Sequence, residues 1–188
     1  TISGVDDSSG VAIRSSTASL YNNIIGPIGG YNGIWIYGSS EVVAIGNTIQ
    51  DTAREPVVHG EYHYRDQGWP SVQPTKSRLY MEGNTISNNS GTCNSQSMYG
   101  GDFQCPAIHI FRTSPTLYNN TITNSVGDAL RIKGGIVNVQ GNTMETESFG
   151  VNISHHDDNY GNKYGSIGYF SHNTIINATQ VYNITESR

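Results

Sequence analysis

A short apolar run followed by Asn, then Thr or Ile, then another apolar residue recurs six times along this chain. The six asparagines of the motif are Asn23, Asn47, Asn84, Asn120, Asn142 and Asn173. Successive ones are separated by 24, 37, 36, 22 and 31 residues. The short spacings predict a coil of about 22 to 24 residues, and the longer spacings predict the same coil carrying insertions.

A second apolar segment, with a period of two, precedes most copies of this motif. It occurs at residues 10–14, 33–37, 107–111, 129–133 and 150–154. The period predicts β-strands with one inward face, and such short strands gain a core only by stacking on neighbouring repeats. We therefore expect one all-β solenoid domain over residues 1–188, with about 6 to 8 coils and with surface-loop insertions at 61–76 and 91–106.

The repeated asparagines have a structural interpretation. Stacked at one position of each coil, they would form an internal ladder in which each side-chain amide bonds to the next, so that buried polar groups are satisfied. We assign all six to this ladder.

The Asn-Thr-Ile coils, such as Asn47-Thr48-Ile49 and Asn84-Thr85-Ile86, resemble the right-handed parallel β-helix repeats of the pectate-lyase-like superfamily. The resemblance covers nearly the whole chain and implies that fold. The superfamily includes polysaccharide lyases, glycoside hydrolases, epimerases, phage tailspikes and archaeal surface proteins, so the fold leaves the function open. No family-specific catalytic motif matches, and no catalytic residue is carried over.

The two ends of the sequence resemble interrupted coils. Thr1-Ile2 aligns with Thr121-Ile122, and residues 181–185 resemble residues 150–154. An uncapped solenoid end exposes unpaired strand edges. We expect this segment to belong to a longer chain, with other domains or subunits covering both ends.

Composition narrows the classes of partner. With 35% apolar and 13% charged residues, the chain is expected to fold. A net charge of −5 with only ten Lys and Arg gives no basic surface for nucleic acid. No apolar run approaches the roughly 20 residues that span a bilayer, so no transmembrane segment is expected.

The two cysteines, Cys93 and Cys105, flank a polar segment with two adjacent glycines. A disulfide between them would close a short loop and stabilise the chain by roughly 3 kcal/mol. It would also imply an oxidising compartment, hence an extracellular or cell-surface location. The alternative is a pair of unrelated thiols.

The positions beside the inward isoleucines are expected to form an outward stripe, because side chains alternate along a strand. It contains Arg14, Trp35, Tyr37, His59, His109, Phe111, Arg131, Lys133, Asn152 and Ser154. Aromatic rings stack on sugar rings, and cations pair with carboxylates or sulfates. The stripe predicts a groove for an acidic polysaccharide, to which His63, Tyr64 and Trp69 of the first insertion would contribute.

Polysaccharide elimination is the candidate chemistry of this groove. It needs a base beside the uronate and a cation that stabilises the resulting anion. Lys133 or His109 could be the base and Arg131 the cation, with Tyr37, His59 or His63 as proton donors. A hydrolase would need two carboxylates. Its candidates are Asp128, Glu61 and Asp66, but no outward position of the stripe is acidic, so elimination is favoured.

No cofactor and no metal site are predicted, although two acidic segments contain residues that could bind a metal ion. His155-His156-Asp157-Asp158 contains metal-ligand residue types within an expected loop, and Asp6-Asp7 could bind calcium with a neighbouring loop.

Two functions follow from these observations. The first is a secreted or cell-surface module that presents a carbohydrate-binding face, with polysaccharide lysis as its candidate activity. The alternative is a purely structural segment of a large surface-layer, sheath, fibre or adhesin protein that assembles through its loops and ends.

Overall fold

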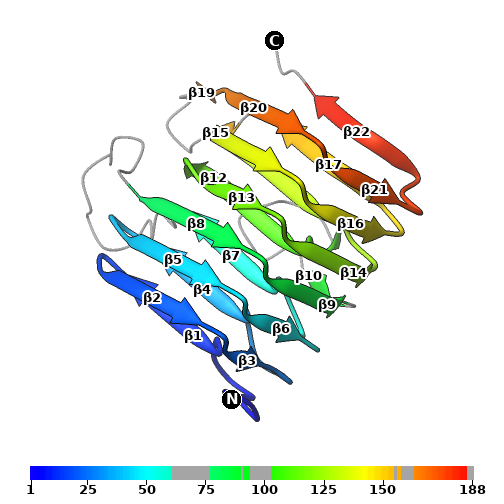
Figure 1. The fold of residues 1–188 in the computed structure, drawn as a ribbon. Helices are drawn as coiled ribbons and strands as arrows, with labels where there is room; N and C mark the ends of the chain where they lie inside the picture. Colours follow the sequence, from blue (N-terminus) through cyan, green and yellow to red (C-terminus); the bar gives the residue numbers. More distant parts are fainter. Residues whose placement is uncertain (61–76, 90, 94–102, 155, 158–162, 186–188) are drawn as a thin grey trace.

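The computed structural model of the 188-residue chain describes residues 1–60, 77–89, 91–93, 103–154, 156–157 and 163–185. Every regular element in these residues is a β-strand. Figure 1 shows the strands stacked in successive layers, from the N-terminal end in blue to the C-terminal end in red. Within the described part of the chain there is no helix that could cross a membrane.

Each layer of the stack is one coil, and a coil contributes up to three short strands. The first row of strands contains β1 (Val11–Arg14), β4 (Ile34–Tyr37), β7 (Val57–Gly60), β12 (Ile108–Thr113), the start of β15 (Leu130–Gln140), β17 (Phe149–Ser154) and β22 (Gln180–Thr185). The second row contains β2 (Thr17–Tyr21), β5 (Glu41–Ile45), β8 (Arg78–Glu82), β13 (Thr116–Tyr118), the end of β15 and β20 (Ser166–Ser171). The third row contains β3 (Ile24–Ile25), β6 (Thr48–Gln50), β9 (Thr85–Asn89), β14 (Thr121–Ser125), β16 (Thr143–Thr146) and β21 (Thr174–Ile176).

Neighbouring strands within each row pair in parallel. The first two rows join through the long strand β15 into one 12-stranded sheet, and the third row forms a 6-stranded sheet. Both antiparallel pairs lie outside these rows: β10 (Thr92–Cys93) with β11 (Phe103–Gln104), and β18 (His156–Asp157) with β19 (Lys163–Tyr164). The segment 91–106, which the sequence predicts as a loop, therefore contains a strand pair. The all-β, parallel arrangement is compatible with a β-helix.

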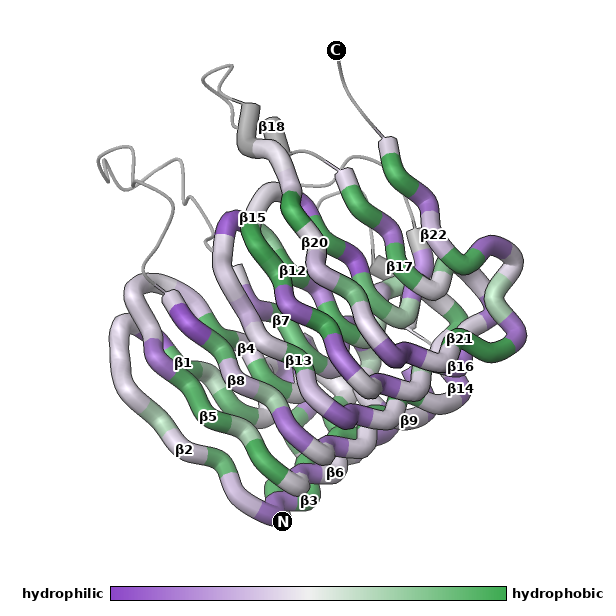
Figure 2. The backbone as a smooth tube through the Cα atoms, turned by 45° about the horizontal axis from the view of Figure 1, so that its top comes forward, coloured by the Kyte–Doolittle hydropathy of each residue, from purple (hydrophilic) through white to green (hydrophobic). Residues whose placement is uncertain are grey.

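The register stacks like residues on like residues. In the first row, Ile13 pairs with Ile36, and Ile110 pairs with Ile132. All four side chains are buried, and each such burial stabilises the fold by about 2 kcal/mol. The tube in Figure 2 shows the same alternation of hydrophobic and hydrophilic colours along strands of the second row such as β8, whose burial also alternates. The period of two thus places one face of each strand in a continuous core.

The six repeated asparagines form a hydrogen-bonded ladder at the corner between the second and third rows. The side-chain Nδ2 of each of the first five donates to the Oδ1 of the asparagine one coil later, at 2.8 to 3.0 Å, in the series Asn23, Asn47, Asn84, Asn120, Asn142, Asn173. The backbone N–H of each donates to the same Oδ1. The amides also donate to strand carbonyls, as Asn84 does to Ala44 at 2.8 Å.

The residue before each ladder asparagine is in the left-handed region of the backbone. These residues are Asn22, Gly46, Gly83, Asn119, Gly141 and His172, with φ between 51° and 70°. Glycine and asparagine adopt this conformation at the lowest steric cost. The recurring Asn or Gly in front of the ladder residue therefore makes the turn between the two rows.

Candidate functional site

The outward face of the first row carries two lines of side chains, one residue per coil in each line. The first line runs through Trp35, Val58, His109, Arg131, Asn152 and Asn183. The second contains Arg14 beside Tyr37, then Gly60, Phe111, Lys133, Ser154 and Thr185. We call these two lines the outer face. Adjacent coils are about 4.8 Å apart, which is the strand spacing of a β-sheet.

His59 does not belong to the outer face, which corrects the sequence-based assignment. It pairs with Ile36 and Ile110, so it occupies an inward position, and its side chain is fully buried. Its Nε2 lies 2.8 Å from Ser77 Oγ, and its Nδ1 lies 3.0 Å from Thr113 Oγ1. Because Ser77 donates its own proton to the Ser40 carbonyl at 3.0 Å, Nε2–H is the donor and Nδ1 accepts from Thr113. His59 is a satisfied core residue.

The middle of the outer face is buried. Val58, Gly60, His109 and Phe111 are all buried. The ring of Phe111 lies over Gly60, where an added Cβ would approach it to 1.6 Å. This buried part interrupts the predicted continuous groove. The sequence does not predict the interruption, because alternation along a strand fixes the direction of a side chain but not whether other residues cover it. Two accessible parts remain, one around Trp35 and one around Lys133.

His109 lies deep in this covered part of the face. Its Nδ1 is 3.4 Å from the buried carboxylate of Glu55, and its ring meets Phe111 edge to face at 4.4 Å. Burial lowers the pKa of His109 to about 4; Glu55 opposes this shift, while Arg131 and Lys133 reinforce it. At neutral pH the imidazole is uncharged. Its full burial does not allow contact with a sugar in this conformation.

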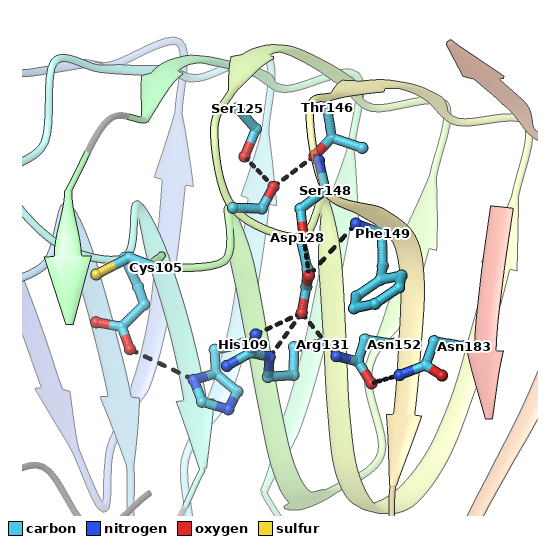
Figure 3. Close-up of polar contacts among 12 residues, drawn as sticks. Cys105, His109, Ser125, Asp128, Arg131, Thr146, Ser148, Phe149, Asn152 and Asn183 are labelled. Atoms are coloured by element: carbon cyan, nitrogen blue, oxygen red, sulfur yellow. Dashed lines mark hydrogen bonds and ion pairs between the residues drawn. The ribbon is translucent and has the colours of Figure 1, made fainter. Parts of the chain in front are cut away.

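Asp128 is the polar centre beside the outer face (Figure 3). Its Oδ2 accepts from Arg131 Nε at 2.7 Å and from Asn152 Nδ2 at 2.9 Å, and lies 2.6 Å from Arg131 Nη2. Its Oδ1 accepts from Ser148 Oγ at 2.8 Å and from the Phe149 N–H at 3.4 Å. The carboxylate is fully buried and makes several hydrogen bonds. Asp128, a candidate hydrolase carboxylate, therefore anchors Arg131 and does not face solvent.

The second accessible part contains Arg131, Lys133, Asn152 and Ser154, all partly exposed. Burial and the neighbouring guanidinium of Arg131 lower the pKa of Lys133, and Asp128 partly opposes this. Arg131 already has a carboxylate partner, so its charge is largely balanced. Lys133 is the outer-face amine whose proton is easier to remove than that of an ordinary lysine.

The first accessible part is aromatic. The rings of Trp35 and Tyr37 stack at 4.3 Å between centroids, with an interplanar angle of 23°. The guanidinium of Arg14 lies 5.7 Å from the Tyr37 ring centre. Trp35 and Tyr37 are partly exposed and Arg14 is exposed. Rings and a cation are thus presented together on adjacent coils.

Several predicted site residues lie outside the described residues: His63, Tyr64 and Trp69, the alternative carboxylates Glu61 and Asp66, and His155 and Asp158. Asp6 and Asp7 are both exposed. Among the residues that the structure describes, no group of three or more His, Cys, Asp or Glu is placed to hold a metal ion.

Sequence reasoning missed Glu55, Ser77 and Ser148, the partners of His109, His59 and Asp128. Glu55 and Ser77 lie outside the strands that carry His109 and His59, and Ser148 lies between strands, as Asp128 does, so no periodic pattern marks these partners. A second, exposed ladder was also missed, in which Asn124 donates to Asn88 at 3.1 Å and Asn88 donates to Asp51 at 2.9 Å. Its signal was available, because an Asx residue recurs four positions after ladder asparagines, at 51, 88, 124 and 177.

Comparisons of the chain with family models, with curated proteins and with solved structures found no match.

Proposed function

We propose that this chain is a right-handed parallel β-helix of the pectate-lyase-like kind and that it binds acidic polysaccharide on its outer face. The observation that carries the binding proposal is the partly exposed Trp35–Tyr37 stack with Arg14 beside it. An aromatic face contributes apolar contact to a sugar ring, and a guanidinium pairs with a uronate carboxylate or a sulfate. Trp35 pairs with the buried Val58 on the next coil, so its strand is packed into the stack.

Binding is better supported than catalysis. A lyase base must reach the proton beside the uronate carboxylate, and His109 is buried. Arg131 is engaged by Asp128 at 2.6 Å, so it is a weak neutraliser of a second carboxylate. Lys133 is the residue that keeps elimination as a candidate activity, because its lowered pKa increases the fraction of free amine.

One assay separates these two activities. The protein is incubated with a panel of uronate and sulfated polysaccharides, while the ultraviolet absorbance of unsaturated sugar and the ligand-induced shift in melting temperature are followed. We expect a thermal shift with acidic polysaccharides that weakens in Trp35→Ala. Growing absorbance that disappears in Lys133→Met would add lyase activity. Absence of both signals would contradict the carbohydrate proposal.

A structural role is the second candidate, and exposed apolar side chains on the last coils favour it. Ile136, Ile167 and Tyr169 are 51%, 51% and 63% exposed on the second row, and Ile184 of β22 is 66% exposed. Surfaces of this kind commonly mark protein contacts. Concentration-dependent assembly measured by sedimentation, abolished in an Ile167→Ser and Tyr169→Ser double variant, would support this role over sugar binding.

The proposed location is extracellular or on the cell surface, with a disulfide between Cys93 and Cys105. Pairing of β10 with β11 places Cys93 opposite Phe103, two residues from Cys105. Cys105 itself is fully buried. Thiol titration of the unfolded, unreduced protein checks the pairing: no reactive thiol is expected, and two reactive thiols would contradict it.

A further inference from the structure

A groove of about 610 Å³ lies at a different corner of the stack from the outer face. Its lining comes from five successive coils, at the point where the third-row strands end. Pro27 and Val126 supply accessible apolar lining, while Asp51, Asn88, Asn124 and Glu147 supply polar groups. The groove therefore runs along the stack, across several coils, and combines apolar contact with polar groups.

The polar side of the groove is the second, exposed ladder. Asp51, Asn88 and Asn124 are in register on successive coils and joined by hydrogen bonds of 2.9 and 3.1 Å. All three residues are left-handed, with φ of 52°, 56° and 52°. Each side chain is therefore held in place before a ligand arrives, and one amide or carboxylate is offered every 4.8 Å or so. This spacing is comparable to the length of one sugar residue in an extended chain.

The charge of the groove is opposite to that of the outer face. Asp51 and Glu147 are both exposed carboxylates, and no Lys or Arg is among the described residues that line it. The adjacent cation in sequence, Arg54, is directed to the Tyr31 ring, 4.5 Å from its centre. Carboxylates without a nearby cation attract a positively charged ligand and repel uronates.

We propose that this groove binds an oligosaccharide of amine-bearing sugars that lies along the stack. The amides of Asn88 and Asn124 bond to the sugar hydroxyls, the carboxylates of Asp51 and Glu147 pair with the ammonium groups, and Pro27 and Val126 contact the ring faces. The site is separate from the outer face and does not depend on its function.

The test is titration of the whole protein with a glucosamine hexamer, followed by calorimetry and by amide NMR shifts. We expect saturable binding with shifts at Asn88 and Asn124, and binding that weakens with salt because the pairs are exposed. The N-acetylglucosamine hexamer has no ammonium groups and is expected to bind at least about tenfold more weakly. Equal binding of the two hexamers would overturn the assigned ligand class.

Variants locate the site. Asn88→Gly and Asn124→Gly remove the amides but keep a residue that tolerates positive φ. Each is expected to weaken binding about fivefold or more, and Asp51→Asn with Glu147→Gln about tenfold or more. The matched control is Asn177→Gly, which removes a left-handed asparagine outside the groove, bonded to Glu145 at 3.1 Å. Unchanged binding in folded groove variants, or loss in Trp35→Ala instead, would overturn the proposal.

Discussion

The asparagine ladder and each line of the outer face contribute one side chain per coil, but they differ in which residue types occupy successive coils. The ladder repeats one residue six times with the same hydrogen bonds. The outer face changes at every coil, from Trp35 to Val58, His109, Arg131 and Asn152. Repetition satisfies the buried polar groups of each coil by the next. Different side chains at equivalent positions can recognise a ligand. Because they do not repeat, their polar groups need individual partners, such as Glu55 for His109 and Asp128 for Arg131.

The largest expected effect is at the centre of the ladder. Asn84→Ala would remove the acceptor of the Asn47 backbone N–H and side-chain amide. It would also remove the side-chain donor to the Oδ1 of Asn120 and to the carbonyl of Ala44. We expect a loss of about 4 kcal/mol in the free energy of unfolding, measured by urea denaturation. The same change at the partly exposed end, Asn23→Ala, should cost about 1 kcal/mol. Equal losses at both positions would show that the ladder does not act through burial.

The second largest effect is expected at Asp128, the buried carboxylate beside the outer face. Asp128→Asn keeps the shape of the side chain but removes the charge that holds Arg131 and Asn152. Breaking a buried pair in this way is expected to cost about 3 kcal/mol of unfolding free energy. The control is Asp51→Asn, an exposed carboxylate, which should change stability by less than about 0.5 kcal/mol. A loss no larger than that of the control would contradict the role of Asp128 as an anchor.

The two buried histidines should make the free energy of unfolding depend on pH, whereas the ladder has no titratable group and should not. Burial lowers the pKa of His59 to about 3 and that of His109 to about 4, below the ordinary value of 6.5. The unfolded chain therefore binds more protons than the folded one below pH 6.5, so stability is present above that pH and is lost as pH falls toward 4. Each histidine contributes about 2 kcal/mol of loss at pH 5.

Urea unfolding at pH 7.5 and pH 5, together with the NMR ring signals of both histidines, measures this effect. The signals should not titrate between pH 7.5 and 5 while the protein stays folded. Titration of either ring near pH 6.5 in the folded protein would contradict its burial as an uncharged group.

The smallest effect concerns recognition without stability. Trp35→Ala should weaken binding of the best acidic polysaccharide about tenfold, which is about 1.4 kcal/mol. Tyr169→Ala removes an exposed aromatic ring from the second row and should leave this affinity unchanged. The affinities of both variants are measured by calorimetry. Equal affinities would show that Trp35 is not part of the binding site.

Much of the fold could be predicted from the repeat. The spacing of the six asparagines and the period of two in the preceding strands were enough for an all-β stack with inward isoleucines, because each coil solves the same packing problem with the same residues. The candidate site could be predicted in part: Trp35, Tyr37, His109, Arg131 and Lys133 do face outward in register. His59 was misplaced because Val57 and Val58 are both apolar and give no alternation, so the sequence does not show that His59 occupies the inward position of Ile36 and Ile110.

Apart from His59, the sequence by itself determined which residues share a level and a face in the first row, since strand alternation and repeat length are local properties of the chain. Only the tertiary structure decided which of those residues are accessible and what each one contacts. It buried His109 against Glu55 and joined Arg131 and Asn152 through the carboxylate of Asp128. The physical reason is that burial and charge pairing join residues from different coils and turns, whose separation in sequence follows no period.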